Sequence, residues 1–505
     1  MSSPEFAGLQ GISGTAVAKR CALLVSPVKR QLLWFIQGMS LAEGGLKKLG
    51  RELLKMFPER VDPSEFAILR RIDYDDAIED QVKQECRDVA LGRQRRGGWS
   101  NGPFSIEEFL VDLCINPRLK IPLKQGELES SEFEVDLARD EFPELDEHEF
   151  HDAKLSYFKD VIGALVEYKR HYEEQAKAEF CLTAIGQQVW KQLDAALKSR
   201  TMVLLDGLEG RGKTEAVRAW CKCHLGVARF VSLDGTNTKT VHFRAFAQAL
   251  GVGHGNSHKV SQMQANVKEV LRISGLMPVI DEAHFFFNQA PRMKTRPEML
   301  DWIDTALCNP PLPVALITTP QFLLCMERAA GQVGWNYRQF RRRCKRYTRL
   351  PRKNTSEDIE AVTRHLLPGA DKATVKQIMA YEALSKRDLS AVGDVVREAK
   401  LLAEEDGARK VTFEHVKRAI HEVLIVSDVP WAEMEKRLQQ QKLGRKGLRA
   451  SAPIVPEAAS EPTETRGRDI SPRLSPGIAS GNRLRFQEPV TALASEPAEA
   501  ILAPG

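Results

Sequence analysis

Residues 207–214 have the composition and spacing of a phosphate-binding loop. An apolar run at 202–206, typical of a buried strand, precedes the loop, and a helical pattern from Thr214 to His224 follows it. This strand–loop–helix context separates a true P-loop from a chance match. Glycines in such a loop let backbone N–H groups turn toward phosphates, and the helix N-terminus adds partial positive charge. We therefore expect ATP to be bound by Gly207, Leu208, Glu209, Gly210, Arg211, Gly212, Lys213, Thr214 and Glu215. Lys213 should reach the β- and γ-phosphates, and the Thr214 hydroxyl should ligate Mg²⁺.

Two carboxylates end a second apolar run. Residues 277–280 are typical of a buried strand, and Asp281 and Glu282 follow directly. Asp281 is placed to hold Mg²⁺ through water, and Glu282 to polarise the attacking water. Because Asp281 would suffice for the metal, the second carboxylate indicates hydrolysis, the alternative being a surface carboxylate at a strand end. Thr319, just after the run 314–318, can hydrogen-bond the γ-phosphate or the water, or can simply cap its strand.

The elements that must position these residues alternate between strands and helices. Strand patterns at 202–206, 229–233, 277–280 and 314–318 are separated by helical stretches near 214–224, 241–250 and 260–273. Such alternation predicts an α/β fold with a parallel sheet covered by helices on both faces. We expect this ATPase core to span 177–352 and a small helical lid to span 353–425. Residues 1–176 should be mostly helical, and 426–505 a linker with a disordered tail.

Composition narrows the class of protein. Of 505 residues, 43% are hydrophobic and 28% charged, as in ordinary soluble globular proteins. No run of 18 apolar residues or signal-peptide pattern occurs, so we expect a cytoplasmic protein with no membrane partner. The only cysteine cluster, Cys221-Lys-Cys223-His224, lacks the second ligand pair that zinc requires, which favours free thiols on a helix. His148, His151 and His171 show no ligand pattern.

Charge is unevenly distributed. The net charge of +5 is too small to indicate nucleic acid by itself. Residues 341–353, however, hold eight Lys and Arg with Tyr347 interleaved. Such density is typical of phosphate-contacting surfaces, although a solvated surface facing a neighbouring subunit is the equal alternative. The acidic run 126–150 is either a solvated loop or an intramolecular screen of a basic surface.

With these residues in order, the region from about 180 to 425 resembles the AAA+ ATPases. Several segments resemble the transposition helper ATPases of the MuB/TnsC type more closely. These segments are Gly210-Arg-Gly-Lys-Thr-Glu-Ala216 with Trp220, Ile280-Asp-Glu-Ala-His284, Val314-Ala-Leu-Ile-Thr-Thr-Pro-Gln-Phe322, and Gln339-Phe340 with Arg343, Tyr347 and Leu350-Pro351. Thr183-Ala-Ile-Gly186 with Val189-Trp190 is similar to the family's adenine-side entry.

The resemblance implies roles for further residues. Thr319 would be the first sensor, and Arg387 the second sensor in the lid. Arg343 would be the arginine finger that reaches a neighbouring subunit's γ-phosphate, with Arg341 and Arg342 as alternatives. A finger delivered in trans makes hydrolysis depend on assembly, and a head-to-tail contact builds a homo-oligomeric ring or filament.

The partners that the resemblance implies are duplex DNA, bound without sequence preference, and a transposase or recombinase. DNA would lie along the inner face of the oligomer, near the loops 234–240 and 255–259. Two helices within 29–54, separated by Gly44-Gly45, and the tail segment 483–487 are weaker candidates for partner contacts.

Two other functions remain open. The first is a replication-initiator or clamp-loader-like AAA+ ATPase, although an initiator would normally add a DNA-reading domain after the lid. The second is a signalling or defence ATPase whose N-terminal region is a sensor or effector. No nuclease or protease constellation is evident in that region.

Overall fold

The computed structural model describes residues 11–24, 26–42, 45–61, 106–115, 149–235, 238–255, 258–287, 292–309, 311–385, 387–434 and 436–437. Contacts divide the chain into two units, 1–434 and 435–505, and every element below lies in the first. The acidic run up to residue 148, His148, the His151 side chain and the tail from 438 onward, including 483–487, lie outside the described residues.

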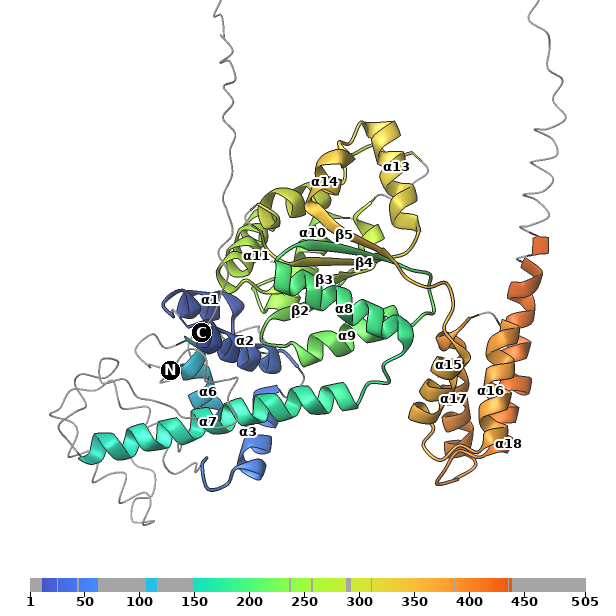
Figure 1. Ribbon diagram of the computed structural model, residues 1–505, viewed down its shortest axis with the longest axis horizontal. Coiled ribbons are helices and arrows are strands. Elements are labelled where there is room, and N and C mark those ends of the chain that lie inside the picture. Colours follow the sequence, from blue (N-terminus) through green and yellow to red (C-terminus); the bar gives the residue numbers. More distant parts are fainter. Residues whose placement is uncertain are drawn as a thin grey trace, which may run out of the picture. The chain divides into compact units, whose positions relative to one another are not determined.

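A five-stranded sheet forms the centre of the core (Figure 1). Its strands are β1 (Met202–Asp206), β2 (Ala228–Ser232), β3 (Met277–Asp281), β4 (Val314–Thr318) and β5 (Cys344–Arg349). They lie in the order β2-β3-β4-β1-β5, and every neighbouring pair is parallel. The four apolar runs therefore form strands as predicted, with β2 displaced by one residue. The fifth strand was not predicted.

Helices cover both faces of the sheet, as the α/β prediction required. Because side chains alternate along a strand, Val203 and Leu205 of β1 pack toward one face and Met202 and Leu204 toward the other. The first face is covered by α8 (Ala184–Ser199) and α9 (Lys213–Cys223). The second is covered by α10 (Lys239–Leu250), α11 (Val260–Ser274), α12 (Glu298–Trp302), α13 (Gln321–Val333) and α14 (Tyr337–Arg343).

Helices from the N-terminal region belong to the same hydrophobic cluster as the second face of the sheet and its covering helices. They are α1 (Gly14–Ala22), α2 (Pro27–Ser40), α3 (Gly45–Met56), α6 (Ile106–Ile115) and the long α7 (Glu149–Ala178). Helix α1 packs on α11, and α7 packs on α9 (Figure 1). The two helices predicted within 29–54 are α2 and α3, which confirms that prediction. Because apolar side chains of both regions fill one cluster, the N-terminal helices are part of the packing of the core.

The lid is a helical bundle with its own hydrophobic cluster. It consists of α15 (Ser356–Leu366), α16 (Lys372–Ser385), α17 (Leu389–Glu405), α18 (Phe413–Arg418) and the π-helical turn η8 (Ala419–Leu424). Thr355 begins α15 with a capping box, in which its hydroxyl accepts from the Asp358 amide and Asp358 accepts from the Thr355 amide. Sheet, covering helices and lid together form the expected α/β fold, a parallel sheet flanked by helices and followed by a small helical bundle. None of the helices that the structure describes is long and apolar enough to cross a membrane.

Candidate nucleotide-binding site

Three adjacent strands, β3, β4 and β1, bring the predicted site residues together at the carboxyl ends of the strands. The register pairs Asp206 of β1 with Thr318 of β4, and Ile280 of β3 with Leu316 of β4. All three strands are parallel, so the P-loop, the carboxylates after β3 and Thr319 after β4 follow neighbouring carboxyl ends. The crevice outside these ends is where ligands bind in open α/β sheets.

The P-loop needs its glycines for backbone reasons. Gly210 and Gly212 have φ of 75° and 78°, in the left-handed region that favours glycine. Gly212 is also the N-cap of α9, so the helix begins directly at the loop. A methyl group on Gly207 would lie 3.1 Å from the side chains of Leu350 and Lys213. These residues shape a loop that can wrap around phosphates.

Lys213 lies inside the loop. Its side chain is buried, and its ammonium donates to the carbonyl oxygens of Gly207 at 2.7 Å and Leu208 at 2.6 Å. Burial lowers the pKa of Lys213, and the nearby Glu282 and Asp281 carboxylates oppose that shift. An incoming phosphate would replace the carbonyl acceptors with a stronger, charged one.

The other P-loop side chains differ in exposure. Thr214 is half-buried in the first turn of α9, and Leu208 is half-buried. Glu209 and Glu215 are exposed, and Glu215 forms an ion pair with Arg218 at 2.9 Å on the surface of α9. The structure thus offers Thr214 as a hydroxyl ligand at the helix start, whereas the Glu209 carboxylate lies close enough to act electrostatically on Lys213 and Glu282.

The two carboxylates after β3 occupy different environments. Asp281 is buried, and its Oδ1 accepts a hydrogen bond from the Glu282 amide at 3.0 Å. Glu282 has φ of 56° and a partly exposed side chain, 3.3 Å from Nδ1 of His284. Burial, then the Asp281 charge, raises the pKa of Glu282, while Lys213 opposes the rise. A raised pKa suits a carboxylate that accepts a proton near neutral pH.

His284 is a positioning residue that the sequence patterns did not single out for a role. It lies in the 3-10 turn η6 (Ala283–Phe286) and stacks against Phe285 with ring centroids 4.2 Å apart. Burial lowers its pKa, so the ring is biased toward the neutral form. Its contact with Glu282 restricts that carboxylate.

Two buried oxygens at the site have no hydrogen-bond partner among the described residues: Oγ1 of Thr319 and Oδ1 of Asp206. Thr319 is 2% exposed and Asp206 is also 2% exposed. Buried polar atoms are normally hydrogen-bonded, so each calls for a partner from a ligand or solvent. Asp206 keeps one partner, because its Oδ2 accepts from the Tyr347 hydroxyl at 2.9 Å. This arrangement of groups fits Mg²⁺–ATP at the P-loop.

The lid contacts the P-loop directly. Arg211 forms an ion pair with Asp388 in the turn before α17, and both side chains are at most 10% exposed. Asp388 also accepts from the Asn354 amide at 3.4 Å, in the link between core and lid. A methyl group on Gly210 would lie 2.6 Å from the Arg387 carbonyl oxygen. Any ligand of the P-loop is therefore next to the lid.

Arg387, predicted as the second sensor, is next to the P-loop through its backbone only. Its side chain is 44% exposed and forms ion pairs within the unit with Asp394 at 2.5 Å and Asp428 at 3.4 Å. A sensor role requires this side chain to leave those carboxylates when ATP binds.

The finger candidates lie at the end of α14. Arg343 contacts Asp304 at 3.5 Å and donates to the Cys308 carbonyl at 3.4 Å and to Asn309 Oδ1 at 3.3 Å. Arg341 and Arg342 are exposed, and no carboxylate of the described residues lies within 4.0 Å of either. Three arginines are thus presented together, and only Arg343 is anchored within its own subunit.

The cysteine cluster on α9 has the environment of structural thiols. Burial raises the pKa of Cys221 and Cys223, and His224 stacks on Trp220 with centroids 4.1 Å apart. No group of three His, Cys, Asp or Glu side chains suited to a metal ion occurs in the part of the chain that the structure describes.

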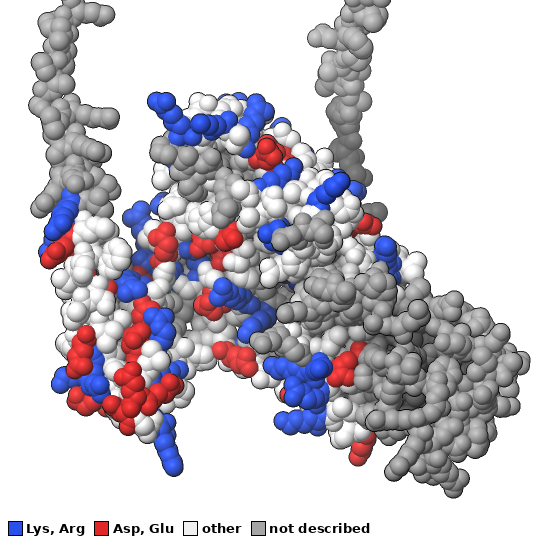
Figure 2. All heavy atoms as spheres, turned by 180° about the vertical axis from the view of Figure 1, so that it is seen from behind, with Lys and Arg blue, Asp and Glu red and all other residues white. Residues whose placement is uncertain are grey.

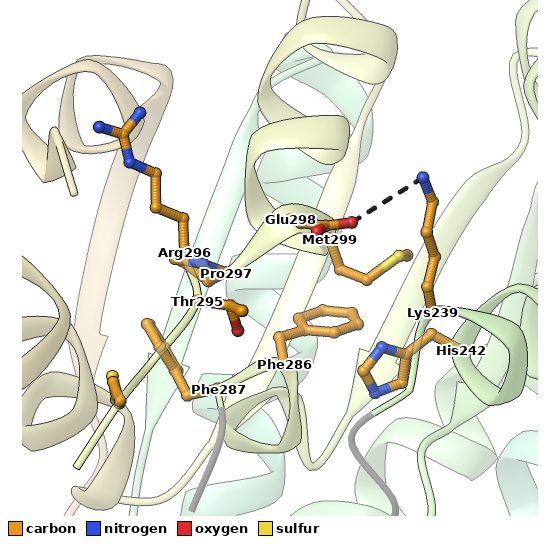
Figure 3. Close-up of a pocket in the computed structure, with 10 residues that line it drawn as sticks. Lys239, His242, Phe286, Phe287, Thr295, Arg296, Pro297, Glu298 and Met299 are labelled. Carbon is orange, nitrogen blue, oxygen red and sulfur yellow. Dashed lines mark ion pairs between the residues drawn. The ribbon is translucent and has the colours of Figure 1, made fainter. Parts of the chain in front are cut away.

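A pocket lies between α10, η6 and the segment leading into α12 (Figure 3). It has a volume of about 170 Å³, with the rings of His242 and Phe286 on its floor and a Lys239–Glu298 ion pair of 3.9 Å at its rim. Lys239 belongs to the loop predicted to face DNA, of which Thr236 and Asn237 lie outside the described residues. The same holds for Asn256 and Ser257 of the loop 255–259.

Among known proteins, similarity to this chain was found with solved structures alone. No family model matches the chain, and no curated protein matches it. Among solved structures, the Aeropyrum pernix ORC1 protein in complex with DNA is 20% identical over 47% of this chain and 65% of its own, with a TM-score of 0.36. Cdc6p from Pyrobaculum aerophilum is 19% identical over 48% and 68%, with a TM-score of 0.36. The Thermotoga maritima RuvB Holliday junction branch migration motor is 15% identical over 47% and 69%, with a TM-score of 0.30.

These similarities reach no further than the layout of the fold. Every identity is at or below 20%, every TM-score is below 0.5, and this chain spans less than two thirds of the ORC1 structure. What this chain can do therefore follows from its own residues.

Proposed function

We propose that this protein is an ATP-hydrolysing AAA+ ATPase that assembles on duplex DNA and directs a transposase or recombinase. The observation that carries the proposal is the convergence of Lys213, the Asp281–Glu282 pair and the orphaned Thr319 hydroxyl at one sheet edge. Each of these groups has a separate task in phosphoryl transfer, and a Gly-rich turn without a ligand would need none of them.

Each side chain has a role that its surroundings support. Lys213 binds the β- and γ-phosphates, and Glu282, held by His284, orients a water and takes its proton. The Thr319 hydroxyl donates to the γ-phosphate or to that water. Thr214 and Asp281 would hold Mg²⁺, which supplies charge neutralisation at the phosphates when bound.

Assembly would complete the site. Arg343, or Arg341 or Arg342 beside it, would reach the γ-phosphate of a neighbouring subunit, so turnover would depend on a ring or filament. For Arg343 this requires release from its contact with Asp304. ATP would stabilise the assembled state, and hydrolysis would release it.

The test is ATP turnover of the full chain with and without long duplex DNA of mixed sequence, at two salt concentrations. We expect DNA to stimulate turnover, and the stimulation to fade at higher salt, because phosphate contacts weaken through counterion release. Lys213→Ala provides the zero-turnover control. Turnover that is indifferent to DNA would instead favour the signalling or defence function. Stimulation by DNA without any effect on a strand-transfer reaction would favour an initiator or clamp-loader role.

A further inference from the structure

Strand β5 differs from the other strands in its exposure. It is at one edge of the sheet, and among the described residues it pairs with β1 alone. Strands β1, β3 and β4 are buried throughout, whereas Lys345, Arg346, Tyr347 and Arg349 of β5 are exposed. Charged residues on an edge strand prevent strand-to-strand aggregation, but one or two would be enough for that purpose.

Positive charge extends along β5 and both of its flanks. No Asp or Glu occurs between Glu327 and Glu357. Eight Lys and Arg side chains in 338–353 are exposed and form what we call the β5 strip: Arg338, Arg341, Arg342, Lys345, Arg346, Arg349, Arg352 and Lys353. Figure 2 shows Lys and Arg side chains predominating at the end of the molecule formed by α13 and α14 (top).

The described residues leave the charge of the β5 strip unneutralised. No carboxylate of the described residues lies within 4.0 Å of any of its eight cations. Three arginines of the lid are neutralised, since Arg364, Arg397 and Arg418 each pair with a carboxylate at 2.6–2.8 Å. Unpaired like charges repel one another, so such a strip destabilises the free protein slightly unless an anionic partner offsets the repulsion.

The spacing of the strip suits a row of phosphates. Arg338, Arg341 and Arg342 are three and four residues apart, on one face of α14. The register of β5 is irregular at Lys345, and Arg346 and Arg349 follow in regular pairing with β1, about 10 Å apart at roughly 3.3 Å per residue. Cations spaced in this way along a helix and a strand can each meet a different phosphate of a duplex backbone.

From these observations we infer that the β5 strip binds the phosphate backbone of duplex DNA, an inference that rests on the proposed function. Protein interfaces need buried apolar anchors, and the strip offers only Tyr347, whose hydroxyl is already bonded to Asp206. A surface made almost entirely of Lys and Arg binds phosphates without reading bases. DNA on the strip would lie on a strand paired along its length with β1, which carries the P-loop.

The test compares two variants of the full chain with equal charge changes. The strip variant is Lys345→Gln/Arg346→Gln/Arg349→Gln, which leaves the candidate fingers untouched. The control variant is Lys400→Gln/Arg409→Gln/Lys410→Gln, three exposed lid cations with no carboxylate within 4.0 Å among the described residues. Binding to a labelled 30-base-pair duplex with ATP is followed by anisotropy from 50 to 200 mM salt.

We expect three lost phosphate contacts to reduce the slope of log K against log salt by about 2.7, at about 0.9 per contact. The ratio of the DNA affinity of the wild-type chain to that of the strip variant should therefore fall about 40-fold between 50 and 200 mM salt. The control variant should bind DNA as the wild-type chain does. Basal ATP turnover without DNA should match the wild-type chain, which also verifies folding.

Three outcomes would overturn the inference. Wild-type-like binding by the strip variant would exclude the β5 strip as the DNA contact without contradicting the proposed function. Failure of the wild-type chain to bind the duplex at 50 mM salt would contradict both the role of the strip and the proposed function. Strip-dependent binding to polyglutamate but not to the duplex would identify an acidic protein as the occupant instead.

Discussion

The contact between the N-terminal helices and the core yields a quantitative prediction at Gln37. Arg229 of β2 is fully buried, and its guanidinium has no carboxylate partner among the described residues within 4.0 Å. It donates instead to the carbonyl oxygens of Trp34 (2.7 Å), Ala228 (2.8 Å) and Leu225, and to Oε1 of Gln37 (2.7 Å). Burial lowers the pKa of Arg229 to about 10, so the cation depends on these acceptors.

Gln37→Leu keeps the size of the side chain and removes its polar atoms. The loss includes the acceptor of Arg229 and the bond from Nε2 to the Leu250 carbonyl at 3.0 Å. A hydrogen bond to a charged group contributes about 1.5–3 kcal/mol, and a neutral one about 0.5–1.5 kcal/mol. We therefore expect local stability around α2 and β2 to fall by roughly 2–4 kcal/mol.

Native-state hydrogen exchange with mass spectrometry measures this fall segment by segment. Amides of α2 and β2 should exchange about 30- to 1,000-fold faster in Gln37→Leu, since 1.4 kcal/mol is a factor of ten. Gln188→Leu, on the exposed face of α8, is the matched control and should change exchange little. Acceleration below threefold in β2, or equal acceleration in the lid helices α16 and α17, would refute this account of the contact.

Four further predictions concern the site and its surroundings. Glu282→Gln should retain ATP binding and lose at least 100-fold in turnover, since general base catalysis contributes roughly 10²–10⁴-fold; turnover at the wild-type rate would exclude Glu282 as the base. Arg343→Ala should lose turnover only under assembling conditions, and equal loss in dilute monomer would indicate a structural role through Asp304. The pKa of the buried His242 is lowered to about 4, mainly by desolvation, so between pH 6.5 and 4 the unfolded chain binds a proton that the folded chain does not. The free energy of unfolding, measured by urea titration, should therefore fall between pH 6.5 and 4 by about 3 kcal/mol more in the wild-type chain than in His242→Phe. Tyr347→Phe removes the one hydrogen bond that the described residues give the Asp206 carboxylate and should lower thermal stability by about 1–3 kcal/mol, checked by calorimetry against Tyr337→Phe.

Local patterns in the sequence were sufficient to predict the strands and the loop that position the site. Strands β1 and β4 have the predicted bounds because a fully buried parallel strand must be a continuous apolar run. The P-loop was predicted for a similar reason, since its glycine spacing reports backbone angles that few other residues adopt. Both signals are contained within a few consecutive residues.

Strand β5 could not be predicted in this way. Its residues, Cys344–Arg349, form no apolar run, because an edge strand exposes its side chains to solvent. Only pairing with β1, about 140 residues earlier in the chain, makes this segment a strand. The same tertiary pairing places the exposed cations of this basic stretch on an edge strand beside β1.

The partners of the functional side chains were likewise decided by the tertiary structure. Arg343 was predicted as a finger from its local surroundings, but its ion pair with Asp304 depends on the packing of α14 against the turn after α12. The Arg229–Gln37 bond joins residues separated by 192 positions, and no local pattern reports it. Sequence patterns encode backbone geometry and burial, whereas the hydrogen-bond partner of a polar side chain depends on which distant element packs against it.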